Sequence, residues 1–281
     1  MSKYFDTTLK ARSTVVSEDI LKTASEPEAP KEKPVLVRKP ASQQFDTTRK
    51  ISIPLSKLPH VQFGNSNSVE PAEESYRALR TRVLRLGASQ KLGSVVVTSA
   101  TQGEGKTLTS LNMALCCAQL HEMRVLLIDA DIRSCGLSRA LDIASKPGLA
   151  DVLFGKCKPE EAVLATDRPN LYVLGSGAHT MPAAELFASG RWQEFVGWCN
   201  ENFKLVIVDS PPVLNLSDVE LITAGCDGVI MVVRAHKTKR QILQKCAGQI
   251  DSKKLIGVVY NGTETNTRYG YGHKYGANRE E

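Results

Sequence analysis

The chain has 281 residues, of which 42% are apolar and 23% charged, and its formal net charge is +6. This length suffices for one larger α/β domain with residues left over for a tail. The seven cysteines form no CxxC pair and no histidine stands at metal-ligand spacing, so neither a disulfide framework nor a zinc site is indicated. We therefore expect a reducing, cytoplasmic compartment.

Charge and hydropathy exclude two further classes of protein. Residues 1–60 hold 11 Lys/Arg against 7 Asp/Glu, which leaves the remainder of the chain nearly balanced. Because duplex binding needs a concentrated basic face, we expect no nucleic-acid partner. The longest apolar runs, such as 229–233, are far shorter than the ~20 residues that cross a bilayer, and no signal peptide is evident. Work at a membrane is therefore expected to go through a partner.

Residues 1–68 are expected to form a disordered polar extension. They contain 6 of the 13 prolines, many Ser and Thr, and mixed charges, and they offer too little apolar surface to offset the entropy of ordering. One six-residue pattern occurs twice there, as FDTTLK at 5–10 and FDTTRK at 45–50. It is either a duplicated docking peptide or a chance match.

The segment 70–87 is expected to be an amphipathic helix. Apolar residues recur at three- and four-residue steps, and a proline at position 71 suits the first helical turn. The apolar positions are Tyr76, Leu79, Val83 and Leu86, and the other faces carry Glu74, Arg77, Arg80, Arg82 and Arg85.

From residue 94 onward, short β-branched runs alternate with helical stretches. Strands that read as continuous Val, Ile and Leu are buried on both faces, which favours a parallel sheet covered by helices. The fold class is therefore α/β, a three-layer α/β/α sandwich over 69–261 with a mainly parallel sheet, followed by a flexible tail at 262–281. The predicted strands are 95–98, 125–129, 171–174, 205–209, 228–233 and 255–260, with helices from 106, near 184–200 and from 238. Tyr260, in the last strand, and Cys116, Cys117 and Cys226 are expected to be buried packing residues.

The strongest motif is ATQGEGKT at 100–107, directly after a predicted strand and before a predicted helix. It fits the pattern G-x-x-x-x-G-K-[ST], except that Ala100 replaces the first glycine. In such a loop, backbone N–H groups converge on a polyphosphate, the lysine reaches the outer phosphates and the hydroxyl ligates Mg²⁺. The sequence therefore predicts nucleotide binding, rather than a plain glycine-rich turn, at Gly103, Glu104, Gly105, Lys106, Thr107 and Leu108.

Two acids, Asp129 and Asp131, end the next predicted strand. Residues two apart on an extended chain face the same way, so both carboxylates should meet at the carboxyl end of the sheet. Their repulsion would be relieved by a Mg²⁺ held by Thr107, and one carboxylate could then accept a proton from an attacking hydroxyl. Arg133 is expected to pair with phosphate or with these acids. The alternative is that an Asp simply caps the following helix.

A third acid follows the apolar strand of VIVDSPP, at 206–212, which the two prolines end. Asp209 stands where the second acid of phosphate-loop NTPases holds Mg²⁺ directly or through water. Three carboxylates and a phosphate loop at successive strand ends together predict a nucleotide site.

The loop, the DADIR strand end (129–133) and the VDSPP strand end (208–212) resemble the Walker A, A′ and B motifs of the bacterial tyrosine kinases (BY-kinases). These are cytoplasmic autokinases of polysaccharide-assembly systems with a P-loop NTPase fold. The resemblance extends over roughly residues 70–276. It includes a pattern similar to the family's subunit-contact helix, Glu74-x-x-Arg77-x-x-Arg80, and a terminal cluster of three tyrosines, Tyr269, Tyr271 and Tyr275.

The resemblance implies a role for each site residue. Lys106 would bind and polarise the phosphates of ATP, while Thr107, Asp131 and Asp209 would hold Mg²⁺ directly or through water. Asp129 is expected to help to deprotonate the incoming tyrosine, with Asp131 as the alternative for that role. Asn261, at a strand end, is expected to contact the adenine base.

The resemblance also implies an activity and partners. The chain would phosphorylate its three terminal tyrosines between subunits of a homo-oligomer such as a ring, and so regulate exopolysaccharide polymerisation and export. A transmembrane polysaccharide co-polymerase would supply an activating cytoplasmic segment and recruit the kinase to the inner face of the cell membrane. Two alternatives are a partitioning-type positioning ATPase and a non-catalytic nucleotide-sensing scaffold. Related partitioning ATPases use a lysine near the start of the loop, where Thr101 and Gln102 stand here.

Overall fold

The computed structural model of the chain describes residues 49–54, 58, 71–90, 92–178, 182–214 and 217–263. Several predicted features lie outside these residues. They are most of the expected N-terminal extension, the repeated pattern at 5–10 and 45–48, and the tail from residue 264 with its three tyrosines.

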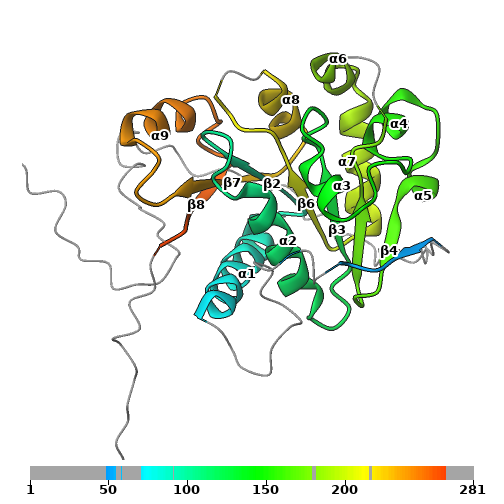
Figure 1. The fold of residues 1–281 in the computed structure, drawn as a ribbon, viewed down its shortest axis with the longest axis horizontal. Coiled ribbons are helices and arrows are strands. Elements are labelled where there is room, and N and C mark those ends of the chain that lie inside the picture. The colour runs from blue at the N-terminus through cyan, green and yellow to red at the C-terminus, as the bar shows by residue number, and fades with distance from the viewer. Residues whose placement is uncertain are drawn as a thin grey trace, which may run out of the picture.

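A mainly parallel sheet forms the middle layer of the described part (Figure 1). Its strand order is β1-β4-β5-β3-β6-β2-β7-β8, and all neighbours are parallel except the antiparallel pair β4 and β5. The strands are β1 (Lys50–Ile51), β2 (Ser94–Ser99), β3 (Val125–Asp129), β4 (Leu164–Thr166), β5 (Leu171–Leu174), β6 (Leu205–Asp209), β7 (Gly228–Arg234) and β8 (Leu255–Asn261).

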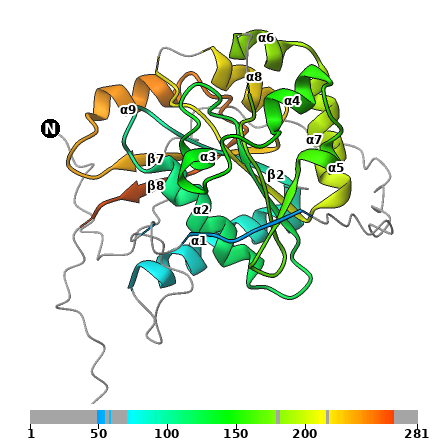
Figure 2. The same ribbon diagram turned by 45° about the vertical axis from the view of Figure 1, so that its right-hand side comes forward.

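Helices cover both faces of this sheet, as Figure 2 shows, with α1 and α2 on one side and α6, α8 and α9 on the other. The helices are α1 (Pro71–Gln90), α2 (Lys106–Ala118), α3 (Gly136–Ala140), α4 (Leu149–Phe154), α5 (Pro159–Ala162), α6 (Ala183–Ala188), α7 (Arg191–Asn202), α8 (Asp218–Ala224) and α9 (Arg240–Ala247).

Alternate residues of each central strand enter different hydrophobic cores. In β2, Val96 belongs to the core under α4, α6 and α7, whereas Val95 and Val97 belong to the core under α1 and α2. The period-2 geometry of a strand sends successive side chains to opposite faces, and both faces here are covered. This arrangement confirms the predicted three-layer α/β/α sandwich.

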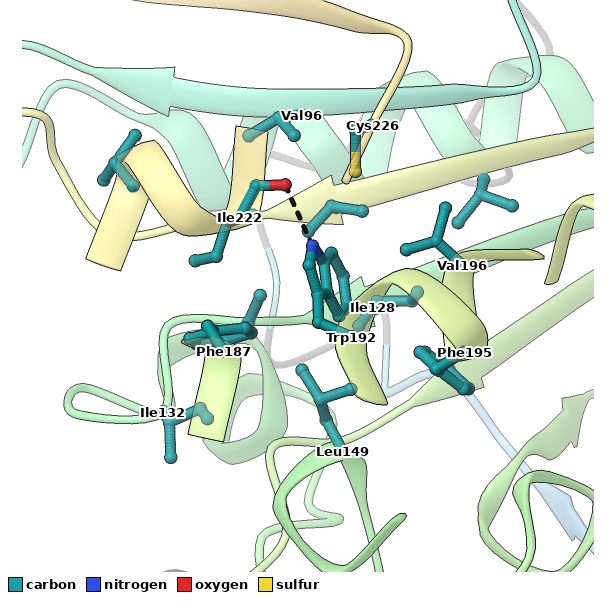
Figure 3. Close-up of a cluster of buried hydrophobic side chains, with 14 of the residues drawn as sticks. Val96, Ile128, Ile132, Leu149, Phe187, Trp192, Phe195, Val196, Ile222 and Cys226 are labelled. Atoms are coloured by element: carbon teal, nitrogen blue, oxygen red, sulfur yellow. Dashed lines mark hydrogen bonds between the residues drawn. The ribbon is translucent and has the colours of Figure 1, made fainter. Parts of the chain in front are cut away.

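An aromatic cluster fills the larger core (Figure 3). Trp192 is fully buried, and its indole Nε1–H donates a hydrogen bond to the carbonyl of Ile222 at 3.0 Å. Phe187 packs edge-on against the indole with ring centroids 5.4 Å apart. Because the buried N–H has a partner, the large ring stabilises this layer without a desolvation cost.

Some elements differ from the sequence-based expectation. The helix expected near 184–200 is two helices, because Gly190 adopts a left-handed conformation (φ 77°) between α6 and α7. The short elements β1, β4, α3, α4, α5 and α8 were not predicted, since segments of two to seven residues carry almost no periodic signal. The expected amphipathic helix is confirmed as α1, and its Leu79 and Val83 are buried in the smaller core.

Two placements correct the sequence reading. Residues 49–54, expected to belong to a disordered extension, contribute strand β1, and Ile53 is only 3% exposed. Tyr260, expected to pack in a buried strand, is 38% exposed, because β8 is the edge of the sheet. In contrast, Cys116, Cys117 and Cys226 are buried as expected.

Candidate active site

The glycine-rich loop joins β2 to α2 at the carboxyl end of the sheet. Gly103 (φ 82°) and Gly105 (φ 95°) both lie in the left-handed region, where a side chain would cause strain. Helix α2 begins at Lys106 with no side-chain cap on its first turn. The N–H groups of that turn therefore remain available to an anion, as in phosphate-binding helices.

Three acids meet the loop from the neighbouring strand ends. Strands β3 and β6 are adjacent and parallel, and their register places Asp129 directly opposite Asp209. Asp131 follows two residues after Asp129, and all three acids are at most 1% exposed. The predicted convergence of carboxylates at this edge of the sheet is thus present.

Lys106 is the cation of this cluster. Its Nζ lies 2.8 Å from Asp131 Oδ2, 3.9 Å from Asp209 Oδ1 and 3.4 Å from the Thr107 hydroxyl. Burial lowers the pKa of Lys106, but attraction by Asp209 and Asp131 outweighs burial and raises it. The lysine is therefore held as a buried cation between the loop and the acids.

Burial makes two of the acids weaker than usual. It raises the pKa of Asp209 to about 7, against the opposing attraction of Lys106. Burial also raises the pKa of Asp129, although hydrogen bonds from Ser138 oppose the shift. Carboxyl groups with raised pKa values in a cleft are suited to accept a proton near neutral pH.

Each of these two acids has one engaged and one unpaired oxygen. Asp129 Oδ2 accepts hydrogen bonds from the Ser138 N–H at 2.8 Å and the Ser138 hydroxyl at 2.6 Å. Asp209 Oδ1 accepts one from the Ser110 hydroxyl at 3.4 Å. Asp129 Oδ1 and Asp209 Oδ2 are buried without a hydrogen-bond partner. Buried polar atoms normally have partners, so these two oxygens point to a missing cation or donor.

The donor set fits Mg²⁺ better than a metal that needs a complete protein cage. Within the described ranges, no three His, Cys, Asp or Glu side chains are grouped as a ready metal site. Mg²⁺ is usually held by one or two carboxylates together with phosphate and water oxygens. The unpaired oxygen of Asp209, Asp131 and the Thr107 hydroxyl meet that requirement.

Other predicted site residues have different neighbours. Arg133 pairs with Asp218 at the start of α8, with 2.8 Å between Nε and Oδ2, instead of with the acid cluster. The side-chain amide of Asn261 donates to the carbonyl of Glu104 at 2.9 Å. Leu108 packs against the core shared by α1 and α2.

The charged helix residues are engaged within the chain. Arg77 pairs with Glu73 at 2.7 Å and with Glu74 at 3.6 Å on α1 itself. Arg80 donates to the carbonyl of Cys116 on α2 at 2.8 Å. These contacts show that Arg80 helps to attach α1 to α2.

Two polar residues of the site were missed by sequence reasoning. Ser138, on α3, holds Asp129, and Thr238, in the turn before α9, donates to the Glu104 carboxylate. Neither belongs to a motif. Ser138 lies nine residues after Asp129 on a short helix, and Thr238 lies 134 residues after Glu104. A single serine or threonine in a sequence gives no signal of such a contact.

Comparison with known proteins identifies the family. A family model described as an AAA domain matches residues 94–254. Tyrosine-protein kinase YwqD of Bacillus subtilis is 34% identical over 202 residues, which cover 71% of this chain and 85% of that protein. The chain belongs to the bacterial tyrosine kinases. The range matched by the family model contains both the phosphate loop and the three acids.

Longer relatives and solved structures agree with this assignment. The putative tyrosine-protein kinase EpsB of Ralstonia nicotianae is 33% identical over 213 residues, which cover 75% of this chain but only 28% of that protein. The solved kinase domain of the Escherichia coli tyrosine kinase ETK matches with a TM-score of 0.63 and 26% identity. The match covers 81% of this chain and 95% of the ETK domain. The sheet described above is therefore the bacterial tyrosine kinase fold.

Proposed function

We propose that this bacterial tyrosine kinase is an ATP- and Mg²⁺-dependent autokinase that phosphorylates Tyr269, Tyr271 and Tyr275 of a neighbouring copy. The observation that carries the proposal is the juxtaposition of Lys106 with three buried acids beside a glycine-rich loop. In this proposal the lysine contacts the phosphates and an acid accepts the proton of the acceptor tyrosine, both at the carboxyl end of the sheet. Phosphoryl transfer needs both, together with a metal.

Each residue of the cluster has a distinct task in this proposal. The N–H groups of the loop and of α2 bind the phosphates, and Lys106 leaves Asp131 to contact their outer oxygens. Thr107, Asp131 and Asp209 would hold Mg²⁺, which when bound neutralises charge on the transferring phosphate. Asp129 has one oxygen fixed by Ser138 and the other unpaired.

That unpaired oxygen makes Asp129 the proposed base. An unperturbed tyrosine has a pKa near ~10, so its phenol needs help to react at neutral pH. Asp129 takes the phenol proton while the phenol oxygen forms a bond to the terminal phosphorus. The bond from that phosphorus to ADP breaks. The raised pKa of Asp129 supports this role, because it brings the acid closer to the operating pH.

The assembly and location of the kinase are also proposals. Self-association would use α1 with Glu74, Arg77 and Arg80, of which Arg80 is partly occupied by its bond to α2. A transmembrane polysaccharide co-polymerase would activate the kinase and recruit it to the inner face of the membrane, where it regulates exopolysaccharide export. Family membership supports this part. No helix in the described segments is long and apolar enough to span a bilayer.

The test is incubation of the purified full chain with labelled ATP and Mg²⁺, followed by mass spectrometry of the labelled protein. We expect label on Tyr269, Tyr271 and Tyr275. The change Lys106→Met should lower labelling by about 100-fold or more, because a group that contacts the transferring phosphate is lost. Substitution of the three tyrosines by phenylalanine should remove the label from the chain. Lys146→Met, an exposed lysine, serves as the matched control.

Three outcomes would overturn the proposal. Full labelling of the Lys106→Met variant would show that the phosphate loop is not the catalytic site. Release of free phosphate with an unlabelled chain would favour a positioning ATPase. Nucleotide binding with neither product would favour a sensing scaffold.

A further inference from the structure

A carboxylate stands inside the phosphate loop itself. Glu104 is 1% exposed although it lies in a loop that binds anions. Its Oε2 accepts the N–H of Thr101 at 3.0 Å, and its Oε1 accepts the hydroxyl of Thr238. A buried carboxylate with two donors is a strong anchor, since hydrogen bonds to charged groups are roughly twice as strong as neutral ones. The Glu104 carboxylate therefore connects the loop to the turn before α9.

The same residue is held a second time through its backbone. The side-chain amide of Asn261 donates to the Glu104 carbonyl at 2.9 Å. A Cβ added at Gly105 would fall 1.9 Å from Asn261 Nδ2, so the amide lies directly against the loop backbone. The Glu104–Gly105 peptide is thus fixed immediately before Lys106.

The residues that hold Glu104 belong to one connected unit. The Arg234 N–H donates to the Thr238 hydroxyl oxygen at 3.2 Å, and the Ala235 N–H donates to the Asn261 carbonyl at 2.9 Å. The turn after β7 and the end of β8 therefore support each other as well as the loop. Asn261 is also the last residue of β8 and directly precedes the segment that carries the terminal tyrosines.

We propose that Thr238 and Asn261 are positioning residues that hold the phosphate loop, through Glu104, in its anion-binding form. We call Glu104, Thr238 and Asn261 the loop clamp. The inference rests on the proposed function only in that the loop binds a nucleotide. It gives Asn261 the role of binding the loop backbone. It also makes the end of β8, which precedes the segment with the three tyrosines, part of the nucleotide site. Because coupling between sites is reciprocal, a bound nucleotide should in turn order the end of β8.

The experiment compares full-length variants by calorimetric titration with Mg-ADP. Asn261→Ala and Thr238→Val should each weaken ADP affinity by about 3- to 10-fold, the range expected for one lost hydrogen bond. Thr238→Ser keeps the hydroxyl and should restore wild-type affinity. Asn202→Ala is the matched control, because Asn202 makes the same 2.9 Å amide-to-carbonyl bond to Trp198 on α7, a helix outside the site. Its ADP affinity should equal that of the wild type.

A second readout separates positioning from general stability. Without nucleotide, amide hydrogen exchange at residues 101–107 should be faster in Asn261→Ala than in the wild type, while exchange in β3 and β6 stays the same. In a double-mutant cycle, the losses of Asn261→Ala and Thr238→Val should not be additive, because both act through Glu104.

The outcomes are distinct. Wild-type affinity and wild-type loop exchange in Asn261→Ala would overturn the loop clamp and leave the kinase proposal intact. Equal loss of affinity in Asn202→Ala would show a general stability effect and would also overturn it. Absence of ADP binding to the wild type would overturn the proposed function itself.

Discussion

Lys106 only partly offsets the negative charge of the three buried acids around it. Four ionisable groups share one water-poor edge of the sheet, and the lysine contacts two of the carboxylates. One cation against three acids leaves excess negative charge, and burial then favours the protonated form even of an acid near the lysine. The raised pKa of Asp209, at about 7, is the result.

This pKa predicts a pH-dependent stability. An acid whose pKa is higher in the folded state than in the unfolded state stabilises the fold at low pH, and that contribution is lost as pH rises from about 4 through 7. Without nucleotide or Mg²⁺, Asp209→Asn should therefore exceed the wild type in free energy of unfolding by about 1–3 kcal/mol at pH 8. The difference should shrink at pH 5. Urea denaturation at both pH values measures it.

The control for this prediction is another buried acid. Asp218 is paired with Arg133, so Asp218→Asn should lower the free energy of unfolding at both pH values. A wild type that is more stable than Asp209→Asn at pH 8 would contradict the assigned cause.

At the scale of elements, Gly225 and Gly197 differ in whether the neighbouring helix leaves room for a side chain. Gly225 ends α8, and a Cβ there would lie 2.5 Å from the Trp192 Nε1 on α7. Gly197, within α7, has no atom within 4 Å of the position of an added Cβ, apart from its chain neighbours and the nearby backbone of its own helix. The first glycine makes room for a ring, whereas the second is on an exposed helix surface.

These two glycines predict opposite effects of the same substitution. Gly225→Ala should lower the free energy of unfolding by about 1–3 kcal/mol, because it overpacks the indole and disturbs its bond to Ile222. Gly197→Ala should raise the free energy of unfolding by about 0.5–1 kcal/mol, because alanine favours the helix. Thermal unfolding of both variants checks this. A stabilising Gly225→Ala would mean that the two helices can move apart without cost.

At the scale of the whole molecule, a segment near the start of the chain completes the sheet. Strand β1 pairs with β4, and the Asp167 carboxylate accepts hydrogen bonds from the Ser52 hydroxyl at 2.6 Å and the Ile53 N–H at 3.2 Å. Ile53 then enters the core shared by α1 and α2. These contacts join parts of the chain more than 100 residues apart.

Ile53→Ala tests whether this segment stabilises the kinase domain. The loss of a buried side chain should lower the free energy of unfolding by about 2–4 kcal/mol. Ile51→Ala, at a half-buried position of β1, should have a smaller effect. Chemical denaturation of the full chain measures both. An effect of Ile53→Ala below about 0.5 kcal/mol would show that residues 49–54 add nothing to the core.

The sequence alone determined the class of fold, the central strands and the acid cluster, because continuous apolar runs and the loop motif depend only on neighbouring residues. The tertiary structure decided how Asp129 is held by Ser138, that Arg133 pairs with Asp218, and that Asn261 supports Glu104. It also decided that Ile53 is buried and Tyr260 exposed. Most of these contacts join segments far apart in the chain, whereas Asp129 and Ser138 are nine residues apart and on different elements. The energies of all these contacts arise only when packing removes water from both partners. Local patterns therefore carry no trace of them.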